Sequence, residues 1–182
     1  MKRTVWTFGL ISGAVLSAMM LLTIPFSESI GFERGMIVGY TTMVLAFLLV
    51  FFGVRSYRDN VAGGKVRFGR ALAVGSLIVL VASTCYVATW EVIYFKVAPD
   101  YASRMQAHMA EKARASGESP QAVERKLEQI RRFEVLYRNP AVNAAITFLE
   151  PLPVGLVFAL VSAGILSRRR RSAPSVMPPV PG

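Results

Sequence analysis

The stretch GMIVGYTTMVLAFLLVFFGVRSYRDNVAGGKVRFGR, residues 35–70, joins a long uncharged apolar run to a cluster of basic side chains. No charged residue occurs from Gly35 to Val54. A helix of this length is about 30 Å long, which matches the hydrocarbon core of a bilayer. Basic side chains then crowd around a single acid, Asp59, and this bias holds a loop on the cytoplasmic side. The stretch therefore predicts a membrane span followed by a cytoplasmic loop. The basic residues are Arg55, Arg58, Lys65, Arg67 and Arg70.

Several ordered blocks of the sequence resemble a known family. The blocks are GMIVGY, LAFLLVFFGVRSYRDN, GGKVRFGRA, ATWEVIYF and ITFLEPLPVGLVFALVSAGIL. They resemble the domain-of-unknown-function family DUF4199, small bacterial membrane proteins with four predicted spans, from about Lys2 to Arg170. The resemblance implies four spans but no activity, because the family has none assigned. Residues 101–132 and the tail after Arg171 lie outside these blocks.

The composition favours a single membrane domain over residues 1–171. Of the 182 residues, 53% are hydrophobic, and they gather into long runs that a soluble globular protein would not carry. The formal net charge is +10, but the basic residues flank apolar runs, so anionic lipid head groups are the expected partner and nucleic acid is not. The single cysteine, Cys85, can form no intrachain disulfide.

The apolar runs predict an all-α fold, an integral membrane four-helix bundle. The expected spans are residues 4–25, 35–54, 71–97 and 141–166. The first run could also be a cleaved signal peptide, but it continues to a full spanning length, so we favour a retained helix. Rows of small residues predict close contacts between helices. These rows are Gly9, Gly13 and Ser17; Gly35 and Gly39; and Gly155, Ala159 and Ala163. The Pro-rich tail, residues 172–182, is expected to be disordered.

Residues 100–138 predict an extramembrane helical hairpin between the third and fourth spans. Asp100 is an expected cap of its first helix, and Ser119-Pro120 is typical of the start of its second. Apolar residues recur at helical spacing in both helices. We expect Met105 and Met109 to face the second helix. Asn139-Pro140 then predicts the start of the last span, and Pro151 predicts a bend within it.

Charge counting predicts that both termini and the 55–70 loop are cytoplasmic, in the inner membrane of a bacterium, with the hairpin on the outer side. A second basic cluster follows the last span. We expect both clusters to contact anionic lipid head groups. The second cluster is Arg168, Arg169, Arg170 and Arg171.

Glu91 and Glu150 are the chemically unusual residues of the spans. Counting from Arg70 and from Arg168 at 1.5 Å per residue places both carboxylates about 27–32 Å from the inner boundary, in one layer at the outer edge. Two hypotheses stay open: the acids tie the last two spans to the hairpin, or they line an outward-open polar pocket. The expected counterions are Arg34, Lys96 and Arg138.

No catalytic motif, cofactor motif or metal-ligand cluster occurs in the sequence, and the single histidine, His108, has no second ligand nearby. An enzyme is therefore the least expected class. We expect a structural or accessory protein of the cell envelope that presents the hairpin to another protein or forms a homo-oligomer. The alternative is a small transporter, or a lipid- or small-molecule-binding protein, that uses Glu91 and Glu150.

Overall fold

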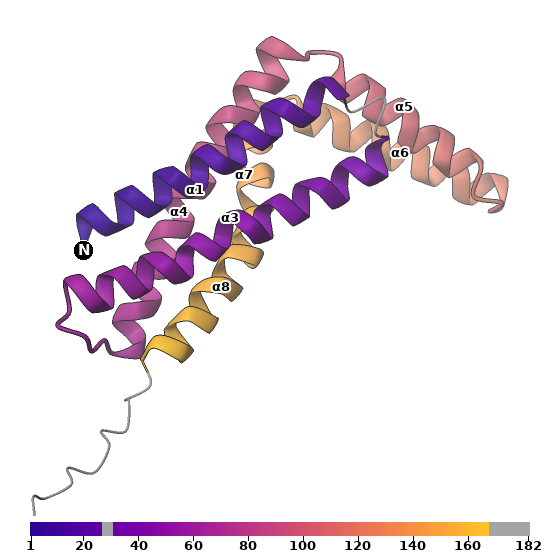
Figure 1. Ribbon diagram of the computed structural model, residues 1–182. Coiled ribbons are helices and arrows are strands. Elements are labelled where there is room, and N and C mark those ends of the chain that lie inside the picture. Colours follow the sequence, from indigo (N-terminus) through magenta and orange to yellow (C-terminus); the bar gives the residue numbers. More distant parts are fainter. Residues whose placement is uncertain (27–30, 168–182) are drawn as a thin grey trace, which may run out of the picture.

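The computed structural model describes residues 1–26 and 31–167, and in these residues the chain is helical with no strand (Figure 1). Four segments are long and apolar enough to cross a membrane: Lys2–Thr23, Glu33–Asn60, Phe68–Val97 and Pro140–Leu166. The predicted four-span, all-α fold is therefore confirmed. Arg168 to Arg171 and the predicted disordered tail lie outside the described residues. In chain order the elements are α1 (Lys2–Thr23), the 3₁₀ turn η1 (Ile24–Phe26), α3 (Phe32–Asn60), α4 (Phe68–Val92), the π turn η2 (Ile93–Val97), α5 (Tyr101–Arg114), α6 (Pro120–Tyr137), α7 (Pro140–Leu149) and α8 (Pro151–Leu166).

Helix α4 is the centre of the bundle. It packs against α1, α3, α7 and α8, and α3 in turn packs against α1 and α8. The start of α1, the loop of residues 61–67 and the end of α8 lie together at one end, which we call the loop end (Figure 1). Helices α5 and α6 pack against each other as a hairpin at the opposite end, which we call the hairpin end.

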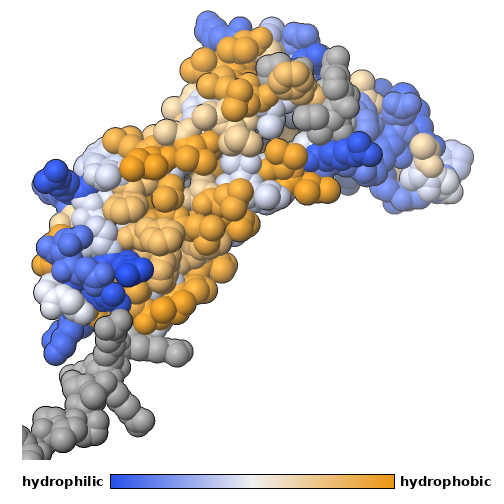
Figure 2. All heavy atoms as spheres, in the orientation of Figure 1, coloured by the Kyte–Doolittle hydropathy of each residue, from blue (hydrophilic) through white to orange (hydrophobic). Residues whose placement is uncertain are grey.

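The surface of the bundle is apolar between two hydrophilic ends (Figure 2). Large hydrophobic side chains point outward from the spans, and Ile37 of α3, for example, is 67% exposed. In water so much exposed apolar surface would drive association. In a bilayer the same side chains meet lipid, which agrees with the four spans.

Glycines bring helices close to α4. A Cβ placed on Gly9 of α1 would lie 2.7 Å from the Cβ of Val81, and one placed on Gly13 would lie 2.6 Å from the Cβ of Cys85. Both distances are shorter than real Cβ contacts. On the other side of α4, a Cβ on Gly75 would lie 2.9 Å from the Cβ of Ala159 in α8. The small-residue rows of α1 and α8 therefore both pack on α4, as the sequence predicts.

The row at Gly35 and Gly39 behaves differently. A Cβ on either glycine would have no described atom within 4 Å. This GxxxG motif therefore makes no close helix contact within the described part of the chain.

Side-chain caps mark the starts of α6 and α7, and the other helices start without one. Helix α3 continues to Asn60, six residues beyond the expected end at Val54, and Tyr57 in this extension is buried. Ser119 caps α6 by accepting from the backbone N–H of Ala122, and Asn139 caps α7 in the same way from that of Ala141. The expected cap by Asp100 is wrong, because its side chain makes no capping hydrogen bond.

The hairpin differs from the predicted contact at Met109. Ala107 and Ala110 of α5 line the groove that α5 shares with Leu127 and Ile130 of α6. Met109, which we expected in this contact, is 47% exposed.

Prolines interrupt the last span. Pro151 has no N–H to donate to the carbonyl of Thr147, and the N–H of Glu150 takes that acceptor at 3.4 Å instead. The helix therefore divides at Glu150 into α7 and α8. This interruption is the bend that the sequence predicts.

Candidate functional site

No hydrogen bond within the described residues joins the two unusual carboxylates. The hydroxyl of Tyr86 in α4 donates to Glu150 Oε2 at 3.0 Å. Glu91 lies five residues further along α4, which is about 7.5 Å, and on a different side of the helix. That both carboxylates lie in one layer stays a prediction. Glu91 Oε1 is buried without a hydrogen-bond partner among the described residues.

Among the described residues, the expected counterions form no ion pair with these acids. Arg138 pairs with Glu134, one turn earlier in α6, at 2.7 Å. Within the described residues, neither Arg34 nor Lys96 forms an ion pair, and both side chains are exposed. A contact of Glu91 with any of these cations stays a prediction.

A polar network joins the end of α6 to the bundle. The indole N–H of Trp90 donates to the Tyr137 hydroxyl at 3.0 Å, and this hydroxyl lies 3.0 Å from Thr147 Oγ1. Thr147 donates to Asn143 Oδ1 at 3.3 Å, and the Asn143 amide donates back to the Tyr137 carbonyl at 3.2 Å. Asn143 is fully buried. Because these bonds connect α4, α6 and α7, they fix the base of the hairpin.

Aromatic rings surround this network. Tyr101, in the first turn of α5, meets Trp90 edge to face with ring centroids 5.4 Å apart. Tyr94 meets Tyr137 in the same way at 5.4 Å, and Phe133 stacks on Tyr137 at 5.3 Å. Burial raises the pKa of Tyr101 and of Tyr137 above the usual value, so both hydroxyls stay neutral at physiological pH. We call Trp90, Tyr94, Tyr101 and Tyr137 the aromatic layer.

An ion pair makes a second contact between the hairpin and a span. Lys112, near the end of α5, pairs with Glu33 in the first turn of α3. Both side chains are mostly exposed. The hairpin is thus attached at its base by the aromatic layer and further along α5 by a surface ion pair.

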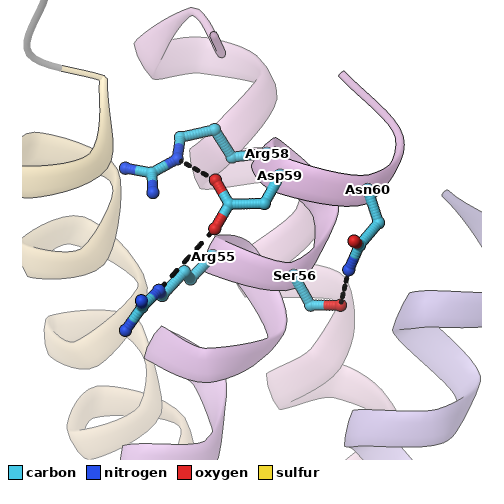
Figure 3. Close-up of polar contacts among 5 residues, drawn as sticks. All are labelled: Arg55, Ser56, Arg58, Asp59 and Asn60. Atoms are coloured by element: carbon cyan, nitrogen blue, oxygen red, sulfur yellow. Dashed lines mark hydrogen bonds and ion pairs between the residues drawn. The ribbon is translucent and has the colours of Figure 1, made fainter. Parts of the chain in front are cut away.

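The loop end carries the basic residues predicted to contact lipid. Asp59 accepts from Arg58 at 2.7 Å and lies 3.6 Å from Arg55, as Figure 3 shows. This acid therefore neutralises part of the charge of both arginines. Lys65, Arg67 and Arg70 are exposed at the same end. Arg168, Arg169, Arg170 and Arg171 lie outside the described residues.

A family model described as "Protein of unknown function (DUF4199)" matches residues 7–168. The chain belongs to this family. The DUF4199 match includes all four spans and the hairpin, so residues 101–132 belong to the family domain although they lack the blocks seen in the sequence. No curated protein and no solved structure matches the chain. The family description assigns no activity, so a function can be proposed only from the arrangement of the residues described above.

Proposed function

We propose that this DUF4199 protein is an accessory or interaction protein of the bacterial cell envelope that presents the α5–α6 hairpin to a protein partner. One observation carries the proposal: the base of the hairpin is held by the Trp90–Tyr137–Thr147 hydrogen bonds, while most of α6 faces away from the bundle. A fixed base orients a surface for binding, and a loosely attached segment would not do so.

The free surface of α6 has the composition of an interface. Val135 is 72% exposed, and Phe133 and Leu136 are also exposed beside charged residues such as Arg132. Apolar and aromatic residues with arginine are enriched in protein interfaces. The alternative is a small transporter, or a lipid- or small-molecule-binding protein, that uses Glu91 and Glu150. It is less well supported because no hydrogen bond within the described residues connects these carboxylates.

We further propose that the loop end is cytoplasmic and the hairpin is outside, in the inner membrane. The basic residues at the loop end support this orientation. Cysteine labelling tests it, with Val61→Cys at the loop end and Gln121→Cys on the hairpin, both in a Cys85→Ala background. A membrane-impermeant reagent should label only Gln121→Cys in intact spheroplasts. Labelling of Val61→Cys alone would reverse the orientation.

Photo-crosslinking in native membranes tests the interaction. A photoreactive amino acid at Gln129 or Val135 of α6 should give a discrete protein adduct, while the same group at Leu45, on the outward face of α3, should give only lipid adducts. An adduct of twice the chain mass would identify a second copy as the partner. Lipid adducts alone from all three positions would contradict the proposal.

A further inference from the structure

We infer that Glu150 and the aromatic side chains next to it form a binding site for an organic ammonium group. This inference goes beyond the proposed interaction role of the hairpin. The ammonium could belong to a lipid head group of the outer leaflet or to a free amine compound, and the chemistry of recognition is the same for both.

The carboxylate of Glu150 has too few partners. Its position before α8 would suit a capping role, but Pro151 and Pro153 have no N–H, and the side chain makes no capping hydrogen bond. No lysine or arginine among the described residues pairs with it. Tyr86 is its single hydrogen-bond donor in the described chain, although an ionised carboxylate accepts about four hydrogen bonds. Glu150 nevertheless stays exposed, so a ligand can reach it.

Aromatic side chains lie beside this carboxylate. Tyr86 touches it directly, and Trp90 follows one turn later on the same face of α4. Tyr137 hydrogen-bonds to Thr147, which is three residues before Glu150 on α7. Tyr101 meets Trp90 edge to face, with ring centroids 5.4 Å apart, so its ring belongs to the same cluster.

These groups fit an organic cation better than a metal ion. Calcium and magnesium need about six or more oxygen ligands, and no group of three metal-binding side chains occurs in the described residues. Tryptophan and tyrosine rings attract weakly hydrated cations such as quaternary ammonium groups. A carboxylate beside these rings adds a charge attraction to the cation, which becomes stronger as water is removed from the pair.

Trp90 provides the signal for a test. The chain has two tryptophans, so Trp6→Phe leaves Trp90 as the one reporter. This protein, in phosphatidylglycerol nanodiscs, is titrated with tetraethylammonium chloride against sodium chloride of equal ionic strength. A second arm adds phosphatidylethanolamine to the nanodiscs in steps. A saturable change in Trp90 fluorescence in the first arm supports a free amine ligand, and one in the second arm alone supports a lipid amine.

Charge variants decide whether Glu150 is the site. Glu150→Gln should weaken binding about tenfold or more, Glu150→Asp should retain most of it, and Glu91→Gln should leave it unchanged as the matched control. Circular dichroism checks that each variant is folded. Equal binding by Glu150→Gln and the parent protein, equal loss in Glu91→Gln, or no saturable change in either arm would overturn the inference. None of these results bears on crosslinking from α6, so the two proposals fail separately.

Discussion

Through the loop end and middle of the bundle, α1 and α8 approach α4 by way of glycine and alanine, whereas at the hairpin end α6 and α7 meet α4 through tyrosine, tryptophan and asparagine. The first region depends on shape, because a single added carbon would clash with a neighbouring helix. The second depends on directional hydrogen bonds and ring contacts. We therefore expect changes in the first region to affect the whole fold, and changes in the second to release the hairpin and leave the spans assembled.

Substitutions in the two GxxxG motifs should give the largest difference in stability. Gly9→Val with Gly13→Val should destabilise the bundle by about 1–3 kcal/mol per site or more, because the new side chains overlap Val81 and Cys85. The same changes at Gly35 and Gly39 should shift stability by less than about 0.5 kcal/mol, because no described atom lies nearby. Thermal unfolding in detergent, followed by circular dichroism, measures both.

A rescue variant sharpens this test. Cys85→Gly removes the carbon that would overlap a new side chain at residue 13, so it should restore part of the stability lost in Gly13→Ala. Equal losses in both glycine pairs would contradict the comparison. A loss confined to Gly35 and Gly39 would mean that the start of α3 packs against another molecule.

Removing one hydroxyl tests the hairpin end. Tyr137→Phe keeps the ring but leaves the Trp90 N–H and the Thr147 hydroxyl without this partner, which should cost about 1–3 kcal/mol of docking free energy. Hydrogen exchange should become faster in α6 and stay unchanged in α1. Tyr40→Phe, at an exposed tyrosine of α3, is the matched control. Unchanged exchange in α6 would show that the rings alone hold the hairpin.

Alkaline pH should loosen the same region. Burial raises the pKa of Tyr137 and Tyr101 above that of the unfolded chain, so the stability from their neutral hydroxyls is complete below about pH 10 and is lost as the pH rises further. Tyrosinate absorbance should show these groups ionising above about pH 10, together with faster exchange in α6. Ionisation of all tyrosines in a single step near pH 10 would contradict the burial of the aromatic layer.

The ion pair between α5 and α3 should have the smallest effect. Both side chains are mostly exposed, so a double-mutant cycle of Lys112→Ala and Glu33→Ala should show little coupling between them. The coupling should weaken further at high salt. If either single variant speeds hydrogen exchange in α6 as much as Tyr137→Phe does, this pair and not the aromatic layer holds the hairpin in place.

Features encoded by nearby residues could be predicted from the sequence. Span lengths follow from uncharged runs, the start of α6 from Ser119-Pro120, the start of α7 from Asn139-Pro140, and the interruption at Glu150 from the proline after it. Each depends on residues within a few positions of one another. The four-span fold was therefore accessible without a structure.

The candidate site depends on distant residues and was largely missed. Tyr86 and Glu150 are 64 positions apart, and no local pattern pairs them. Asn143 and Thr147 do carry a signal, because two polar residues one turn apart in an apolar span predict a buried hydrogen bond, but their link to Tyr137 could not be foreseen. The two GxxxG motifs have the same spacing, and only packing distinguishes the one that meets a neighbouring helix from the one that does not.

The π turn at the end of α4 sets how the hairpin is rotated about the axis of that helix. The N–H of Ala98 reaches back five residues to the carbonyl of Ile93 at 2.8 Å, one residue more than in an α-helix, and the adjacent Ile93 and Tyr94 are both buried. One residue corresponds to about 100° of helical rotation. Deleting one residue from this turn should therefore swing Tyr101 and the hairpin around the axis of α4, away from Trp90. In this way the one extra residue of the π turn sets the direction, around the axis of α4, in which the hairpin projects.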